Sequence, residues 1–259
     1  MEGSHDREGS THIYRKSAWI LTGTDEVVTA SRLQILFYQA LREEHETTFT
    51  YEIRPFCWVT GEGLIGSSRK HRGRSSGISN TGKLDAHHIV PVDWVLEEMR
   101  KNCTNEQIHK YIHNEYRNNP TDPVFLLLQK IIKITYSSEN GVLIDPDYHE
   151  KLHSKCGNNP ETLIEFMRIR CLVTYRQLQN DTGDKIPREV VVDGTVRPGK
   201  PFILKRWTSL MADRGLFPVN IDTANQKSNY VYKPTFLDKL KTEFNQFRSD
   251  STNISLRRS

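Results

Sequence analysis

Two pairs of histidines constrain the fold of this chain more than any other feature of its sequence. His87 and His88 are neighbours in the run Leu-Asp-Ala-His-His-Ile-Val-Pro, which is typical of a strand that ends at a proline. His149 and His153 stand four residues apart behind an Asp-Pro pair, which is a typical helix start. A strand presents successive side chains on opposite sides, whereas a helix presents residues four apart on one face. Where such a strand and helix pack together, one strand histidine and both helix histidines converge.

Three converging imidazoles are suitable ligands for a divalent cation. The other strand histidine points elsewhere and can serve as a general base, because a neutral imidazole takes up a proton near neutral pH. Hydrolysis of a phosphodiester needs an activated water, a proton acceptor and stabilisation of negative charge on the phosphate. The pattern therefore favours a metal-dependent hydrolytic site.

Two further polar residues stand where they can support this site. Asp85 precedes His87 by two residues, so on a strand the two share a face, and the carboxylate can accept the second ring proton of a metal ligand. Asn140 begins a turn and a short strand ahead of the histidine helix. Its side chain can hydrogen-bond either the base or the backbone beside the base, and in both cases it fixes the orientation of the imidazole.

The two segments resemble the two halves of the HNH motif, also called the ββα-metal or His-Me finger, of endonucleases. The first half is Asp85-Ala-His-His-Ile-Val-Pro91, and the second runs from Asn140 to His153. The second half is most similar to the nuclease domains of DNA-cleaving colicins, including the proline before its first histidine. The resemblance implies that the metal ligands are His87, His149 and His153. It implies that His88 is the general base, that Asn140 orients it, and that Asp85 supports the site.

Many HNH proteins carry Cys-x-x-Cys pairs that hold a structural zinc ion beside the finger. Here Cys57-Trp-Val-Thr60 stands where a first pair belongs, but Thr60 replaces the second cysteine. The other cysteines, Cys103, Cys156 and Cys171, are widely spaced. We therefore expect no structural zinc, and we expect a helical insertion and apolar packing to hold the finger. Such cysteine usage also favours a reducing, intracellular setting, whether cytoplasmic or organellar.

The expected fold is α+β, with a ββα-metal finger embedded in a mainly helical domain that also carries small β-hairpins. Residues 1–30 are expected to form a tail and a short strand. Residues 31–180 form the catalytic domain, and a helical insertion over 93–135 separates the halves of its motif. A β-hairpin is predicted over 50–66. Residues 188–259 form a basic C-terminal extension that binds DNA.

Apolar periodicity and capping residues predict the remaining elements. A strand is expected over 18–21 and another over 189–192. Helices are expected near 30–45, over 146–157, over 160–178, near 203–214 and over 234–247, and three helices are expected in the insertion, one of them capped by Thr104. His109 and His113 in the insertion also stand four residues apart, but no carboxylate pattern accompanies them, so they are interpreted as surface histidines.

Positive charge gathers in two parts of the chain. The loop 67–77 carries Arg69, Lys70, Arg72 and Arg74. The segment 198–259, which includes Lys205 and Arg206, has eleven Lys and Arg against five Asp and Glu, a net of +6 in a chain whose total is +4. These cations are expected to contact DNA phosphates. The alternative is a solvated basic surface, and charge alone does not decide between the two.

The function expected from the resemblance is metal-dependent hydrolysis of double-stranded DNA at specific sites, as in a restriction or homing endonuclease. Mg²⁺ or Mn²⁺ is the expected catalytic ion, while three imidazoles also favour Zn²⁺, Ni²⁺ or Co²⁺ by affinity. Three alternatives stay open. They are an inactive DNA-binding protein with a three-histidine metal site, a non-specific defence or toxin nuclease, and a purely structural zinc site.

The sequence offers little about membranes or assembly. No apolar run approaches the roughly 20 residues that cross a bilayer, and the polar N-terminus is unlike a secretory signal. No membrane partner is therefore expected. A palindromic DNA target would require a homodimer, which stays open because no dimer face can be recognised.

Overall fold

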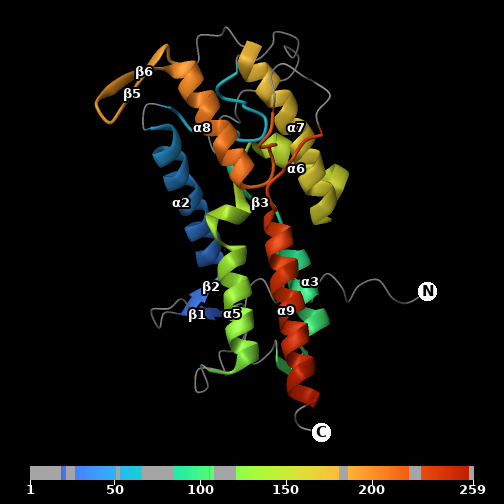
Figure 1. Cartoon of the computed structure of the whole chain (residues 1–259). Coiled ribbons are helices and arrows are strands. Elements are labelled where there is room, and N and C mark those ends of the chain that lie inside the picture. The colour runs from blue at the N-terminus through green and yellow to red at the C-terminus, as the bar shows by residue number, and fades with distance from the viewer. Residues whose placement is uncertain are drawn as a thin grey trace, which may run out of the picture.

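The described part of the chain is mostly helical and contains three small pairs of strands. The computed structural model describes residues 19–21, 27–50, 53–65, 84–104, 106–107, 121–180, 186–221 and 229–256. Within these ranges every sheet is a two-stranded antiparallel pair and helix predominates, so the expected α+β class is confirmed. Figure 1 shows β3 near the middle of the molecule, with α7 and α8 above it and α3, α5 and α9 below it.

The paired strands are β1 (Trp19–Leu21) with β2 (Val27–Thr29), β3 (Asp85–His88) with β4 (Gly141–Ile144), and β5 (Glu189–Val192) with β6 (Thr195–Pro198). The described helices are α2 (Ala30–Phe49), α3 (Val92–Asn102), α5 (Pro123–Thr135), α6 (Pro146–Cys156), α7 (Pro160–Asn180), α8 (Gly199–Asp213) and α9 (Phe236–Leu256). A single 3-10 turn, η3 (Ser138–Asn140), leads into β4.

β3, β4 and α6 form a ββα unit although a long insertion separates the two strands in sequence. The strands pair antiparallel, with His87 opposite Val142 and His88 opposite Gly141. The backbone N–H of Ile89 donates to the carbonyl of Asn140 at 2.8 Å, which extends the pairing past the end of β3. The insertion runs from the end of β3 to the start of β4 without separating the two strands. Its helices α3 and α5 pack on each other and on α9.

Local capping fixes both ends of α6. The Asp145 carboxylate accepts hydrogen bonds from the backbone N–H groups of Asp147 and Tyr148, and Pro146 occupies the first turn. Gly157 ends the helix with φ 59°, a conformation that side chains disfavour. The predicted start and end of this helix are confirmed, and they set the rotation of the face that carries His149 and His153.

The predicted hairpin over 50–66 is wrong. Within residues 53–65 the chain forms turns, and its strand-like pairing is an isolated bridge between Glu62 and Ile65. The backbone N–H of Cys57 donates to the Glu62 carbonyl, while the N–H of Trp58 donates to the Leu143 carbonyl at 2.8 Å. The loop therefore closes on itself and covers the edge of β4, instead of pairing as two limbs.

A hairpin occurs instead at β5 and β6, of which only the first strand was predicted. Asp193 and Gly194 connect the strands, with φ 50° and 72°, the signs that a two-residue hairpin turn requires. Both C-terminal helices predicted near 203–214 and 234–247 are present, but α8 begins earlier, at Gly199, and α9 continues further, to Leu256. Thr104 and Gln107 exchange capping-box hydrogen bonds, as expected for a helix start, although residues 108–120, with His109 and His113, lie outside the described residues.

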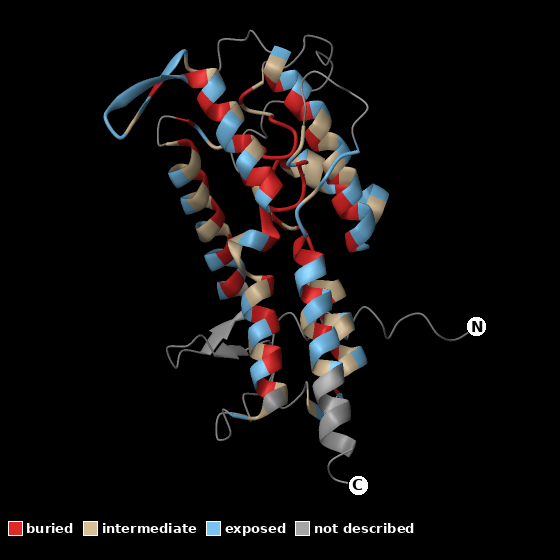
Figure 2. Ribbon diagram, in the orientation of Figure 1, coloured by how far each residue is buried: buried red, intermediate tan, exposed pale blue. Residues whose placement is uncertain are grey.

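The buried apolar side chains form one continuous core that includes residues of the C-terminal segment. Trp58 from the loop over β4 and Trp207 from α8 are both fully buried, and the Trp207 indole N–H donates to the Trp58 carbonyl at 2.6 Å. Figure 2 shows the buried faces of α2, α5, α8 and α9 turned inward, whereas the β5–β6 hairpin is largely exposed. Among the described helices, none is both long and apolar enough to cross a membrane.

Candidate metal centre

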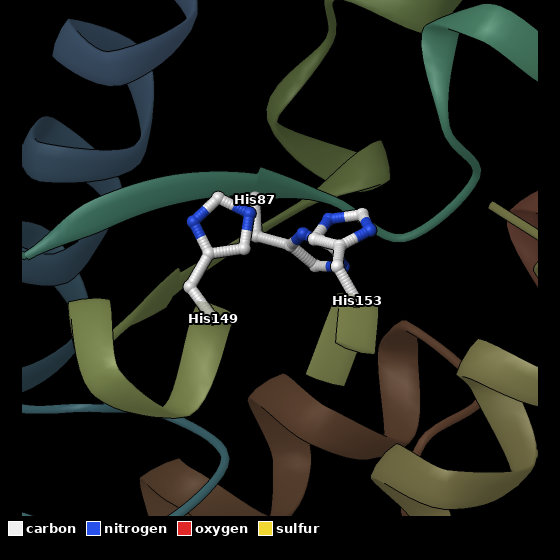
Figure 3. A group of neighbouring side chains, drawn as sticks. All are labelled: His87, His149 and His153. Carbon is white, nitrogen blue, oxygen red and sulfur yellow. The ribbon is translucent and has the colours of Figure 1, made fainter. Parts of the chain in front are cut away.

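His87 on β3 meets His149 and His153 on α6. Their ring centroids lie 5.0 Å apart for His87 and His149, 5.1 Å for His87 and His153, and 5.0 Å for His149 and His153. One nitrogen from each ring lies within 4.8 Å of the others, a group that can hold a metal ion. Figure 3 shows the single ring from the strand facing the two rings from the helix. The convergence expected from the sequence is therefore present.

Hydrogen bonds fix the tautomers of the two helix histidines. Nδ1 of His149 lies 2.9 Å from Oδ2 of Asp85, and Nδ1 of His153 lies 3.1 Å from the carbonyl oxygen of Gly157. A carbonyl or a carboxylate can only accept, so each Nδ1 carries the proton and donates it. In a neutral ring the lone pair is then on Nε2, which suits both residues to bind a cation through Nε2. Asp85 therefore contacts His149 on α6 and not, as the strand spacing suggested, His87.

His87 contributes a nitrogen that lacks any hydrogen-bond partner among the described residues. Its side chain is only 3% exposed, and Nε2 is one of the buried polar atoms without a partner. Burial, followed by the neighbouring His149 and His153, holds the pKa of His87 well below its usual range, so this imidazole is neutral at neutral pH. A buried, unsatisfied nitrogen costs about 1–3 kcal/mol, and a cation bound there would remove that cost. The donor set fits a divalent metal.

His88 faces the opposite side of β3, toward α2. Its ring stacks on Phe37 with centroids 4.0 Å apart and an interplanar angle of 9°, and it meets Tyr136 edge-on at 5.1 Å and 88°. The side chain is half-buried, and its Nε2 lies below the surface. The two neighbouring histidines thus have different surroundings, as alternation along a strand requires.

Asn140 is fully buried and binds the backbone that follows His88. Its Oδ1 accepts from the N–H of Val90 at 2.9 Å, and its Nδ2 donates to the carbonyls of Val90 at 3.1 Å and of Thr135 at 2.9 Å. Of the two partners that the sequence left open for this amide, the structure shows the backbone beside His88. Asn140 joins the end of the insertion to the turn after β3.

Arg214 is a buried component of the site's scaffold that sequence reasoning missed. Its guanidinium donates to the carbonyls of Gly141 and Ser138, which flank Asn140, and pairs with the Glu44 carboxylate at 2.7 Å. The side chain is 4% exposed and lies over the Trp58 ring at 4.8 Å. No pattern distinguishes this arginine from the surface cations around it in the sequence.

The predicted DNA-binding residues fall into two groups. Arg69, Lys70, Arg72 and Arg74 lie outside the described residues. Lys205 and Arg206 are exposed on α8, without an ion pair to any described carboxylate, and the Arg206 guanidinium lies over the Phe202 ring at 5.5 Å. These two cations are on the surface, where a phosphate could reach them.

Other cations of the C-terminal segment are paired with carboxylates. The pairs are Lys233 with Asp213, Lys239 with Glu139, Lys241 with Glu161 and Arg248 with Glu98. Three of these carboxylates lie on other elements of the fold, so the segment packs against the rest of the chain with complementary charge. Its formal charge of +6 therefore overstates the positive charge that it presents to a partner.

Comparisons of the chain with protein-family models, with curated proteins and with solved structures found no match.

Proposed function

We propose that this chain is a metal-dependent endonuclease of the HNH type that hydrolyses phosphodiester bonds of double-stranded DNA. The observation that carries the proposal is the ββα unit, in which His87 joins His149 and His153 while the adjacent His88 faces away from them. A purely structural metal site requires only the three converging residues. A second histidine next to a ligand, half-exposed and held in a defined orientation, supports a hydrolytic role.

The residues divide the chemistry as follows. His87, His149 and His153 would hold the cation, and Asp85 and the Gly157 carbonyl keep the two helix residues in the required tautomer. When bound, a divalent cation supplies stabilisation of negative charge on the phosphate and on the leaving oxygen. Neutral imidazoles add no negative charge, so they would leave the full double charge of such an ion available to the phosphate.

His88 accepts the proton of the attacking water. A neutral imidazole has one ring nitrogen that can accept this proton. The Asn140 side-chain amide acts on the backbone in this arrangement, because it bonds Val90 and Thr135. It holds the Val90 backbone two residues beyond His88, which fixes where β3 ends and where the imidazole is presented. The catalytic ion of the proposal is Mg²⁺ or Mn²⁺, and restriction-like or homing-like cleavage is its expected biological form.

DNA cleavage by purified protein tests the proposal. Supercoiled plasmid is incubated with wild type, His88→Ala, His153→Ala and Ser154→Ala in Mg²⁺, Mn²⁺, Zn²⁺, Ni²⁺, Co²⁺ or EDTA. Ser154 is the matched control, because it is exposed on the same helix beside His153. We expect cleavage by wild type and Ser154→Ala, and a loss of about 100-fold or more in His88→Ala, the contribution usual for a general base.

Two outcomes contradict the proposal in different ways. If wild type and His88→Ala give the same amount of cleaved plasmid in every metal, the chain is not a nuclease of this kind. If both proteins nevertheless bind metal, the inactive metal-binding alternative is favoured. Undiminished cleavage in EDTA removes the role of the cation. Sequencing of the cut ends distinguishes a site-specific enzyme, with recurring ends, from a non-specific defence or toxin nuclease, with scattered ends.

A further inference from the structure

The ring of His88 is held by aromatic side chains from two other elements. Phe37 of α2 covers one face of the imidazole at 4.0 Å, nearly parallel, and Tyr136 meets it edge-on after the end of α5. Phe37 and Tyr136 also contact each other edge-on, with centroids 6.3 Å apart and an angle of 90°. Phe37 is 1% exposed, so its own position is set by the core.

The strand opposite His88 leaves room for this stacking. The partner of His88 across the pair is Gly141. A Cβ atom at position 141 would lie 2.6 Å from Cζ of Phe37 and 2.8 Å from the terminal carbons of Leu41, distances that real contacts do not reach. Only glycine therefore allows the Phe37 ring to reach the imidazole. The need for glycine comes from this close approach, since it lies in an extended strand.

Stacking limits the motion that matters for proton transfer. The terminal torsion of a histidine is broad and roughly two-fold, so a free ring exchanges the position of Nδ1 with that of Cδ2, and the position of Nε2 with that of Cε1. A ring packed flat against Phe37 and bounded at the edge by Tyr136 keeps one plane and one orientation. The ring nitrogens then stay in their places, and the base is oriented before substrate arrives.

We propose that Phe37 is a positioning residue that orients the His88 imidazole for proton transfer, with Gly141 providing the space for it. The inference rests on the proposed nuclease function, in which His88 is the general base. Phe37 acts through His88 and does not touch the metal ligands' shared face, since His87 points to the other side of β3. It should therefore affect turnover and leave metal binding unchanged.

Paired substitutions in α2 separate positioning from stability. Phe37→Leu removes the stacked ring and keeps an apolar side chain. Phe49→Leu is its matched control, because Phe49 is a fully buried phenylalanine of the same helix that contacts His45 and Phe56 instead. Gly141→Ala displaces the Phe37 ring while Phe37 itself is retained. For each protein, kcat and KM for a DNA substrate, the Zn²⁺ affinity by calorimetry and the His88 ring-proton NMR shifts are measured.

We expect kcat to fall roughly 10- to 100-fold in Phe37→Leu and in Gly141→Ala, a loss typical of a misplaced catalytic group, with KM and Zn²⁺ affinity unchanged. Phe49→Leu should keep the wild-type kcat at a similar loss of stability. The upfield ring-current shift of His88 should disappear in Phe37→Leu and persist in Phe49→Leu. Equal kcat in Phe37→Leu and Phe49→Leu, with wild type active and His88→Ala inactive, overturns the positioning role alone. Equal cleavage by wild type and His88→Ala overturns the nuclease function, and the positioning role with it.

Discussion

Nε of Arg214 donates to the carbonyl oxygen of Gly141 at 2.7 Å, so a residue of the C-terminal third holds the first residue of β4. The same guanidinium reaches Ser138 on the other side of Asn140 and pairs with Glu44 from α2. A buried cation with this many partners links α2, the strand of the site and the segment after α8. This one buried arginine therefore joins three parts of the fold beside the candidate metal centre.

Removing the Arg214 guanidinium is expected to destabilise the fold strongly. Arg214→Met leaves the Glu44 carboxylate and the carbonyls of Gly141, Ser138 and Leu210 without this donor, at a cost of about 3–5 kcal/mol for breaking a buried ion pair. Arg214→Lys keeps the charge but cannot reach all partners, and Glu44→Gln keeps a hydrogen-bond acceptor at the position of the carboxylate. Urea unfolding should rank the midpoints as wild type, Glu44→Gln, Arg214→Lys, Arg214→Met. Unchanged midpoints would mean that the network contributes nothing.

Replacing Asp85 is expected to weaken metal binding. Its carboxylate holds the Nδ1 proton of His149, and loss of such a partner typically lowers metal affinity about 10- to 100-fold. Asp85→Asn, which can still accept a hydrogen bond from Nδ1, should lose less metal affinity than Asp85→Ala. Titration calorimetry with Zn²⁺ measures this, with Glu150→Ala on the exposed side of α6 as a control. If Asp85→Ala binds Zn²⁺ as tightly as Glu150→Ala, the hydrogen bond does not tune the ligand.

Replacing Asn140 by aspartate, which has nearly the same shape, is expected to destabilise the fold. Asn140→Asp would replace the two donated hydrogen bonds by a carboxylate that faces the carbonyls of Val90 and Thr135. Each unsatisfied buried partner costs about 1–3 kcal/mol, and repulsion adds to this. Thermal unfolding should therefore place Asn140→Asp below Asn140→Ala, although aspartate is closer in shape. If Asn140→Asp unfolds at a higher temperature than Asn140→Ala, the Asn140 amide does not donate to the carbonyls of Val90 and Thr135.

His45 is expected to make the fold sensitive to acid. Burial, opposed by the hydrogen bond to Ile53 and assisted by the charge of Arg42, lowers the pKa of His45 from 6.5 to about 4. The unfolded chain therefore takes up this proton at a higher pH than the folded protein does. The contribution to stability is present in full above pH 6.5 and is lost as the pH falls toward 4, in total about 3 kcal/mol.

Unfolding free energies between pH 8 and pH 4 measure this effect. His45 accepts a hydrogen bond from the Trp58 indole, so the matched variant is His45→Gln, which keeps an acceptor but does not titrate. Wild type should lose more stability than His45→Gln between pH 6.5 and pH 4. Parallel curves for the two proteins would assign the acid sensitivity to other groups.

Sequence reasoning located the parts of the site that depend on local rules. Asp145, Pro146 and Gly157 delimit α6 by capping, and alternation along β3 separates His87 from His88, so each could be predicted from a few neighbouring residues. The Asp193-Gly194 pair is a typical two-residue hairpin turn, so the β5–β6 hairpin could also have been predicted from local sequence.

The parts that were missed depend on tertiary contacts. Phe37 and Arg214 look like an ordinary core residue and an ordinary surface cation, and only packing brings them to His88 and to Gly141. Apolar and polar residues alternate in the loop that contains Cys57, as in a hairpin strand. In the fold, however, the backbone N–H of Trp58 donates to Leu143 of β4 and not to a second limb of a hairpin. Such choices depend on distant residues, which periodicity does not register.

The pairing of β3 with β4 also means that the candidate metal centre can form only late in synthesis of the chain. Synthesis proceeds from the N-terminus, so His87 and His88 emerge well before the strand and helix that complete their site. The partner strand is secured only after Arg214 has been made, since that side chain fastens Gly141. A nascent chain that has passed His88 but has not reached His149 therefore carries the first two histidines without the assembled centre. The assembled three-histidine group is therefore one of the last features that the growing polypeptide acquires.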